Sequence, residues 1–492
     1  MRLGNGGYFS AHLSNEFVLT VAPVEAFGFI NKNVGQISIQ GSLIFNILEN
    51  KSLSFIGGDL FIDNAILFAP SGRINLVAVA DDGEVKLTTS DIVLNDFDQL
   101  GQITLLQDSI STLQEIGLAN LDVGGLPGGQ IFIRAGQFYL DKGLIFADTY
   151  GGKGLGIDIV IDGKMQILNG ARITADNCPP GENCGNSQGG NISLTAQVLQ
   201  LNGRDEDNKE DFASSLSGIA TNNFSDGTGG NINIKTSRLE INTGLIQAAT
   251  EKDGAAGNIH IQATDSIFLE NQSAISVSTA EGSSGHAGNI HVETQRLALN
   301  YGQINSFSLG SGNASSIKIA ANTALLTNSY IVTGARYAAG GDITLNIPER
   351  LSLNNTEIKT NVVGDEIHDN AGDITISQPQ FLTLHDSRLI ASANRGNGGN
   401  INIQADQIQP FGDSEINASS LLGLNGQLII NDIDISQNLT MLPTTYTDPT
   451  TLIKEGCHIQ FGENPSSFFV VGRDGSPTAP DDFQTRFQNF HH

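Results

Sequence analysis

The chain has 492 residues, of which 57 are glycine, only 16% are charged and none is tryptophan. Aspartate and glutamate number 52 against 25 lysines and arginines, which gives a formal net charge of −27, and a protein this acidic repels nucleic-acid phosphates, so we exclude nucleic-acid binding. No run of eighteen or more apolar residues occurs, so we expect no transmembrane helix.

The first 30 residues lack the pattern of a signal peptide. No cluster of positive charge follows Arg2, and the apolar run at 17–22 lies between Glu16 and Glu25. A Sec-exported chain begins with a positive segment, an apolar core and a small-residue cleavage site. We therefore expect the chain, expressed as it stands, to be retained in the cytoplasm.

One phrase returns along the chain from residue 229 to residue 403. It reads Gly-Gly-Asn-Ile-Asn-Ile at 229–234 and 398–403, Ala-Gly-Asn-Ile-His-Ile at 256–261 and Gly-Gly-Asp-Ile-Thr-Leu at 340–345. The first apolar residues of its copies are Ile232, Ile259, Ile290, Ile317, Ile343, Ile374 and Ile401, at spacings of 27, 31, 27, 26, 31 and 27. Weaker copies begin near Ile131, Ile157 and Ile192. A repeat of this period indicates stacked structural units.

Within each copy, apolar and polar residues alternate, which indicates strands. The copy that starts at Ile259 holds three such segments, and glycine, asparagine and serine between them supply turns. Each copy then forms one closed coil whose strands pair in parallel with those of the next coil. The sequence predicts an all-β fold, a single right-handed parallel β-helix of about 27-residue coils with three short strands each, in about fifteen coils.

The residue before each first isoleucine is short and polar. Four copies have Asn231, Asn258, Asn289 and Asn400, and two copies have Asp342 and Asp373. Such a side chain in a turn bonds most simply to backbone. We predict a structural ladder here.

Two cysteines, Cys178 and Cys184, lie six residues apart in a turn-rich segment. Their spacing predicts a local disulfide in an oxidising compartment, with two unpaired thiols as the alternative. A zinc site is disfavoured because structural zinc takes four ligands and no second pair is near. Cys457 has no evident partner.

The largest departure from the period is the loop 202–218. Its acidic residues are Asp205, Glu206, Asp207, Glu210 and Asp211. The loop lacks the glycine and the terminal glutamate of an EF-hand. We interpret it as a solvated loop, with cation binding as the alternative.

Two histidines, His260 and His291, hold the same outward position in adjacent copies, between Asn233 and Lys318. We expect a surface ladder of imidazoles. A metal ion shared between the two rings is the alternative.

The rival function is a carbohydrate-active enzyme, since polysaccharide lyases and glycosidases also use β-helices. Their sites need acidic residues clustered across neighbouring coils. The phrases Asn-Thr-Asp, Gly-His-Gly and Arg-Ile-Lys of glycosidases with this fold are missing. We therefore predict that the protein is not an enzyme, with no catalytic, cofactor-binding or metal-ligating residue and no cofactor.

The recurring Gly-Gly-Asn-Ile-x-Ile, Leu-x-Leu and Ile-x-Ala pattern resembles filamentous-haemagglutinin-like exoproteins of the two-partner secretion type. Further stretches are similar to the same family: Ala26-Phe-Gly-Phe-Ile, Ile37-Ser-Ile-Gln-Gly, Leu53-Ser-Phe-Ile-Gly-Gly-Asp-Leu, Ala69-Pro-Ser-Gly-Arg-Ile-Asn-Leu-Val-Ala-Val-Ala and Asn464-Pro-Ser-Ser-Phe-Phe-Val-Val-Gly-Arg-Asp-Gly-Ser-Pro. The resemblance implies a secreted or cell-surface adhesin with a partner, an outer-membrane β-barrel transporter. A flat face rich in asparagine, serine and threonine suits weak multivalent contacts with a glycan or another cell-surface ligand, and it equally suits a pure scaffold with no ligand.

The chain departs from this family at its start. Family members begin with a signal peptide and a secretion domain that carries an Asn-Pro-Asn-Gly-type turn, and neither is found here. We interpret 1–82 as the first coils, following or finishing that domain, 83–455 as the β-helix array and 456–492 as a C-terminal signature segment. Without a partner for the first coil, partly bare apolar faces around Phe27 and Ile37 would favour end-to-end self-association.

Overall fold

The computed structural model describes residues 1–4, 7, 24–30, 32, 34–41, 44–110, 119–180, 184–206, 215–364, 366–431 and 433–434. The chain divides into two compact units, Met1–Asn438 and Leu439–His492. Cys457 and the segment 456–492 lie outside the described residues, and the division at 82 and 455 stays a prediction. No helix in the described ranges is long and apolar enough to cross a membrane.

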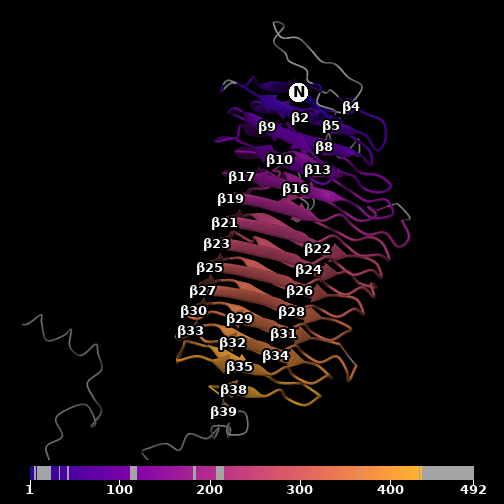
Figure 1. Cartoon of the computed structure of the whole chain (residues 1–492). Helices are drawn as coiled ribbons and strands as arrows, with labels where there is room; N and C mark the ends of the chain where they lie inside the picture. The colour runs from indigo at the N-terminus through magenta and orange to yellow at the C-terminus, as the bar shows by residue number, and fades with distance from the viewer. Residues whose placement is uncertain are drawn as a thin grey trace, which may run out of the picture. The chain divides into compact units, whose positions relative to one another are not determined.

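The first unit is a β-solenoid. Its parallel sheets stack in about 11 turns, with coils about 28 residues apart and almost no helix. Figure 1 shows the strands stacked in chain order from β5 to β38. The all-β fold and the parallel β-helix architecture are confirmed.

The strands of the described residues form three sheets. The wide sheet has 22 strands and holds the first two strand positions of each coil. Its strands are β3 (Ile37–Gln40), β5 (Ser52–Gly57), β6 (Leu60–Asp63), β8 (Arg73–Ala78), β11 (Gln102–Leu106), β13 (Gln130–Ala135), β14 (Gln137–Asp141), β16 (Gly156–Ile161), β17 (Lys164–Leu168), β19 (Ile192–Asn202), β21 (Ile232–Asn242), β23 (Ile259–Glu270), β25 (Ile290–Asn300), β27 (Ile317–Thr327), β29 (Ile343–Asn346), β30 (Arg350–Asn354), β32 (Ile374–Ser377), β33 (Phe381–His385), β35 (Ile401–Gln404), β36 (Gln407–Phe411), β38 (Leu428–Ile430) and β39 (Ile433–Asp434).

The narrow sheet holds the third strand position and has 13 strands in the described ranges. They are β4 (Ile44–Asn46), β7 (Ile66–Phe68), β12 (Leu121–Asp122), β15 (Leu144–Phe146), β18 (Arg172–Thr174), β20 (Ser217–Ala220), β22 (Gly244–Thr250), β24 (Ala274–Thr279), β26 (Gln303–Ser308), β28 (Tyr330–Ala335), β31 (Glu357–Val362), β34 (Arg388–Ala393) and β37 (Glu415–Asn417). The lateral sheet is antiparallel and consists of β1 (Arg2–Leu3), β2 (Val24–Phe29), β9 (Gly83–Leu87) and β10 (Ile92–Asn95).

The register of the wide sheet follows the sequence repeat. The first isoleucines of the copies pair with one another in an unbroken series: Ile232, Ile259, Ile290, Ile317, Ile343, Ile374 and Ile401. All seven side chains are fully buried, and one continuous apolar core runs through the coils. The predicted spacing and the predicted inward facing are confirmed.

The strand count per coil varies along the stack. In the middle coils the first two strands form one long strand, as in β23, and the register shifts between Ala263 and Ser266, which is the signature of a β-bulge. In later coils Pro348 and Pro379 separate the two strands, because proline has no N–H to donate to the ladder. Three short strands therefore occur in the end coils and two in the middle.

The number of turns is smaller than the fifteen that we expected. A constant period overestimates it because two coils are much longer than the rest. The two long coils are those between Ile74 and its register partner Ile131, and between Ile192 and its register partner Ile232. The extra residues leave the coil as insertions.

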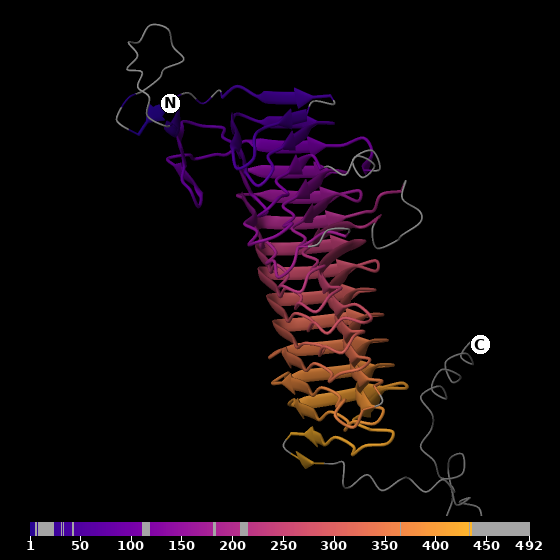
Figure 2. The same cartoon turned by 90° about the vertical axis from the view of Figure 1, so that its right-hand side faces the viewer.

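The first of these insertions contributes β9 and β10 to the lateral sheet, whose other strands, β1 and β2, precede the first coil. This sheet lies beside the first coils (Figure 2). Strand β9 pairs with β10 and β2 in antiparallel fashion. Phe27 of β2 packs half-buried on a cluster that contains the outward-facing Val77 and Phe132 of the wide sheet. Phe27, where we expected a partly bare apolar face, is half-buried because it packs in this lateral cluster. Ile37 is half-buried against the core.

Candidate functional site

The asparagines before the buried isoleucines tie adjacent coils together. The backbone N–H of Asn258 donates to Asn231 Oδ1 at 2.8 Å, and that of Asn289 donates to Asn258 Oδ1 at 2.8 Å. The aspartates act in the same way, since the N–H of Asp373 donates to Asp342 Oδ1 at 2.9 Å. The predicted ladder of hydrogen bonds to backbone is confirmed. The N–H group from which each side chain accepts belongs to the next coil.

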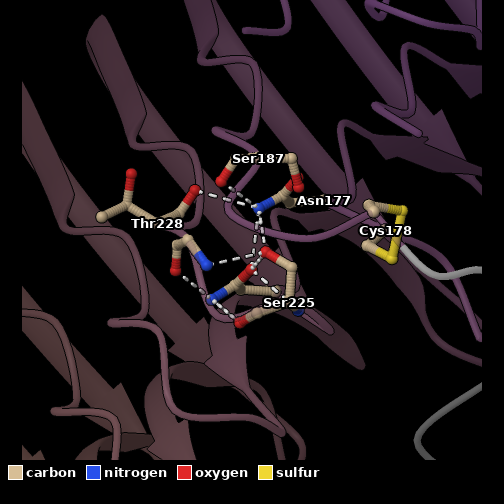
Figure 3. The surroundings of a disulfide bond; sticks show 8 residues. Asn177, Cys178, Ser187, Ser225 and Thr228 are labelled. Atoms are coloured by element: carbon tan, nitrogen blue, oxygen red, sulfur yellow. Dashed lines mark hydrogen bonds between the residues drawn. A yellow bond between two sulfur atoms is a disulfide. The ribbon is translucent and has the colours of Figure 1, made fainter. Parts of the chain in front are cut away.

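The Cys178–Cys184 disulfide is present, with Cα atoms 5.6 Å apart. Beside it lies the fully buried Asn177 (Figure 3). Asn177 Nδ2 donates to Asn223 Oδ1 at 2.8 Å and to the Ser187 carbonyl at 3.1 Å, and Ser187 Oγ donates to Asn177 Oδ1 at 2.6 Å. Because buried amides are stable only when they are hydrogen-bonded, this network stabilises the turn.

Asn177 belongs to a corner column of aligned residues. The column contains Thr149, Asn177, Asn223, Thr250, Thr279, Ser308, Ala335, Val362 and Ala393. Its first six members are polar; for example, Thr250 Oγ1 donates to the Gly254 carbonyl at 2.7 Å. The last three are apolar and pack together. In the coils of Ala335 and Val362 a threonine two positions earlier takes the polar role: Thr333 Oγ1 donates to the Gly341 carbonyl, and Thr360 Oγ1 donates to the Gly372 carbonyl at 2.6 Å.

Three aspartates of neighbouring coils lie beside this corner: Asp148 and Asp176 directly precede Thr149 and Asn177, and Asp122 is the last residue of β12. The N–H of Asp176 donates to Asp148 Oδ1 at 2.9 Å, so the two are stacked. Burial raises the pKa of Asp176 to about 6, against the opposing hydrogen bonds from Asn222. Burial, and then the Asp176 carboxylate, raise the pKa of Asp148 well above its usual range. Burial raises the pKa of Asp122 to about 6.

Asp176 also lines a cavity of about 230 Å³ together with Arg172, Asn222 and Gln247. We did not predict this acid cluster, because its members lie outside the recurring glycine phrase and come together only through the coil register. Within the described ranges, no group of three or more histidine, cysteine, aspartate or glutamate side chains is placed to hold a metal ion.

The histidine ladder forms as predicted. The rings of His260 and His291 stack with their centroids 5.0 Å apart, between Asn233 and Lys318 in register. His291 Nε2 lies 2.8 Å from Glu293 Oε1, a contact that we did not predict. Burial and then His291 lower the pKa of His260.

The predicted acidic loop is described in part, and Asp207, Glu210 and Asp211 lie outside the described residues. Asp205 is buried at its base, where its N–H donates to the Ser215 carbonyl at 2.7 Å. Glu206 is exposed, and Arg204 Nε lies 3.2 Å from Glu206 Oε1. Arg204 and Glu206 form one wall of a surface cavity.

This cavity and its neighbour form what we term the groove. The first holds about 400 Å³ and is lined by Gly203, Arg204, Glu206, Thr243, Asn271, Gln272 and Tyr301. The second holds about 330 Å³, and its lining includes Gln200, Asn202, Arg238, Glu240, Asn242, Phe268 and Glu270. The two adjoin because Asn202, Asn242 and Glu270 directly precede Gly203, Thr243 and Asn271 in the chain. The groove therefore crosses the ends of β19, β21 and β23.

A turn column of left-handed residues borders the groove. It contains Asn169, Gly203, Thr243, Asn271, Tyr301, Asn328, Asn355 and Asp386, all with positive φ. Backbone hydrogen bonds align its members; for example, the Tyr301 N–H donates to the Thr327 carbonyl at 3.1 Å. Asparagine, aspartate and glycine adopt this conformation readily, whereas a bulky residue does so rarely. Tyr301, at φ 57° and 55% exposed, is the aromatic member.

Both arginines of the groove lie against glutamates. Arg238 Nη2 lies 2.5 Å from Glu240 Oε1, and its guanidinium lies 5.1 Å from the centre of the Phe268 ring. Arg204 lies against Glu206 in the same manner. The groove thus combines aromatic surface, amides and paired charges.

No family model matches the chain, and no curated protein or solved structure does. The resemblance to filamentous-haemagglutinin-like exoproteins therefore depends on the recurring motifs and the flanking stretches. The β-solenoid is consistent with an exoprotein of that kind.

Proposed function

We propose that this protein is a structural and adhesive exoprotein of the haemagglutinin-like kind, without catalytic activity. The observation that carries this proposal is the outward face of the wide sheet, where uncharged polar side chains recur at equivalent positions of several coils, while the middle coils have Lys235, His260, His291, Glu293 and Lys318 at these positions. The uncharged side chains include Ser193, Thr195, Asn233, Gln262, Thr344, Asn346, Thr375, Ser377, Asn402 and Gln404. Because coils repeat every 4.8 Å or so, a ligand-bearing surface meets many equivalent weak contacts at once.

An extracellular or cell-surface location belongs to the proposal. The Cys178–Cys184 disulfide supports it, since disulfides persist mainly in oxidising compartments. An outer-membrane β-barrel transporter is the partner that the resemblance suggests. The ligand class that suits the polar face is a glycan or another hydroxyl-rich cell surface.

The test is binding of the purified full chain to glycans printed at increasing density. We expect binding that is weak at low density and rises steeply with density, because multivalent contacts add. Binding that is absent at every density, or that does not depend on density, would contradict the proposal.

The stacked aspartates favour a second candidate, a carbohydrate-active enzyme. A carboxyl group that stays protonated near neutral pH can act as a general acid on a glycosidic oxygen. Asp176, with its pKa raised to about 6, lies in a cavity beside Arg172. Incubation with a polysaccharide panel separates the two functions: release of sugar by the native chain, lost in Asp176→Asn, would establish the enzyme.

A further inference from the structure

We propose that the groove is a binding site for a neutral oligosaccharide and that the exposed ring of Tyr301 is the platform on which one sugar stacks. This inference rests on the proposed adhesive function and deepens it, because it names the site and the class of glycan. It distinguishes the groove from the weak contacts spread over the rest of the wide sheet.

The first step is the backbone at Tyr301. In the coils on either side the turn column has Asn271 and Asn328, which tolerate the left-handed conformation that Tyr301 also adopts. Strained residues of this kind persist where function requires their side chain. Tyr301 combines this unusual backbone with 55% exposure of the residue, and it lines the groove.

The second step is the polar lining. Around the tyrosine lie Thr243, Asn271 and Gln272, and the adjoining cavity adds Gln200 and further amides. Amide side chains offer both donors and acceptors, which is what the alternating hydroxyls of a sugar require. An aromatic face beside such groups covers the apolar C–H face of a sugar ring.

The third step is the charge of the lining, which selects a neutral ligand. Glu206, Glu240 and Glu270 outnumber Arg204 and Arg238. Each arginine already lies against a glutamate, so neither offers an uncompensated positive charge. A sulfated or uronic-acid glycan would meet net negative potential, both here and from the whole chain at −27.

The fourth step is size. The two cavities hold about 400 and 330 Å³, within the roughly 300–1,000 Å³ of small-ligand sites. The turn column members Gly203, Thr243, Asn271 and Tyr301 belong to successive coils, so the groove follows the stacking direction. It suits an oligosaccharide of several units more than a single sugar.

The experiment compares two tyrosine variants of the full chain. Tyr301→Asn places in the groove the residue found in both neighbouring coils, so it should fold. Tyr330→Asn is the matched control, because Tyr330 is 48% exposed but lies on the narrow sheet. Binding is measured to neutral oligosaccharides and to their sulfated and uronic-acid counterparts, printed at one density, and melting curves check folding.

We expect the native chain and Tyr330→Asn to bind the neutral set, and Tyr301→Asn to bind about tenfold more weakly, the loss of one stacking contact. Tyrosine fluorescence should change on titration with a bound neutral oligosaccharide, since the chain has no tryptophan, and Tyr301→Asn should abolish that change. Equal binding by both variants, or binding of anionic glycans alone, would overturn the groove site while leaving an adhesive function standing. Absence of glycan binding by the native chain would overturn the groove and the glycan-binding form of the proposed function together.

Discussion

Two regions of the solenoid share one core and differ at their corners. The groove coils, residues 156–308, have a polar corner column and a turn column interrupted by Thr243 and Tyr301. The regular coils, residues 317–417, have an apolar corner column and a turn column that begins with Asn328 and Asn355. There Asn355 Nδ2 donates to Asn328 Oδ1 at 2.7 Å, which ties one coil to the next.

The comparison separates what the fold requires from what it permits. Buried isoleucines repeat in both regions, because an apolar core is needed in every coil. The corner can be filled either by saturated hydrogen bonds or by small apolar side chains. A bulky residue in the turn column is strained, whereas asparagine, aspartate and glycine are not. Tyr301, an exposed aromatic residue at such a strained position beside the groove, therefore marks a candidate binding site.

The largest effect should come from charge in the shared core. Ile290→Asp in the groove coils and Ile374→Asp in the regular coils each place an unpaired carboxylate at a fully buried position, at a cost of several kcal/mol. Asn289→Ser, on the polar ladder, should be mild. Thermal melts of the three variants test this. A clear difference in melting temperature between the two aspartate variants would contradict the claim that both regions share one core.

The corners of the two regions should differ in how much stability they lose when a hydrogen-bonding side chain is removed. Asn223→Ala removes an amide that donates to the Gly227 carbonyl at 2.9 Å and accepts from Asn177 at 2.8 Å, so we expect a loss of about 3 kcal/mol. Thr360→Val in the regular coils removes one hydroxyl donor from the Gly372 carbonyl and should cost about 1 kcal/mol. Chemical denaturation measures both, and equal losses would show that the two corners depend on hydrogen bonding alike.

Asp176, in the groove coils, stacks on Asp148, and its effect on stability depends on pH. Because burial raises the folded-state pKa of Asp176 from 3.8 to about 6, the folded chain binds this proton more tightly than the unfolded chain. The group therefore weakens folding progressively as pH rises from 3.8 to 6. Asp176→Asn should raise stability at pH 7 by up to about 2 kcal/mol and leave it unchanged near pH 3. A gain of equal size at both pH values would contradict ionisation as the cause.

The histidine ladder should give the smallest effect. The pKa of His260 is lowered from 6.5, so the folded chain binds this proton more weakly, and stability falls as pH drops below 6.5. The Glu293 carboxylate acts in the opposite direction on the pKa of His260 and offsets part of this loss. Replacing both histidines with glutamine should improve stability at pH 5 by less than about 1 kcal/mol. Loss of bound metal and of stability in the double variant would favour a metal site instead.

Much of the fold could be predicted because the repeat determines the register. Each isoleucine of the recurring phrase pairs with its next copy, as its spacing requires. The lateral sheet could not be predicted in this way. Strands β9 and β10 alternate with the same period as coil strands, and alternation does not specify the partner strand. The insertions also explain why the expected number of turns was too high.

The groove could not be predicted from the sequence, for a different reason. Its walls join Arg204 to Tyr301 across coils of unequal length, and the long coil between Ile192 and Ile232 conceals that alignment in the sequence. The disulfide was predictable because Cys178 and Cys184 are local. The stacking of Asp148 on Asp176, in contrast, appears only once the register is known.

The most direct test is a reciprocal exchange within the turn column, with the free energy of unfolding as the measurement. Tyr301→Asn would complete the series from Asn271 to Asn355 and relieve strain, so we expect it to be more stable than the native chain by about 1 kcal/mol. Asn328→Tyr would introduce the same strain into the regular coils and remove the contact with Asn355, so we expect a loss of at least that size. If Tyr301→Asn instead lost about 1 kcal/mol or more, Tyr301 would serve the stack itself, and its place at the groove would no longer indicate a binding site.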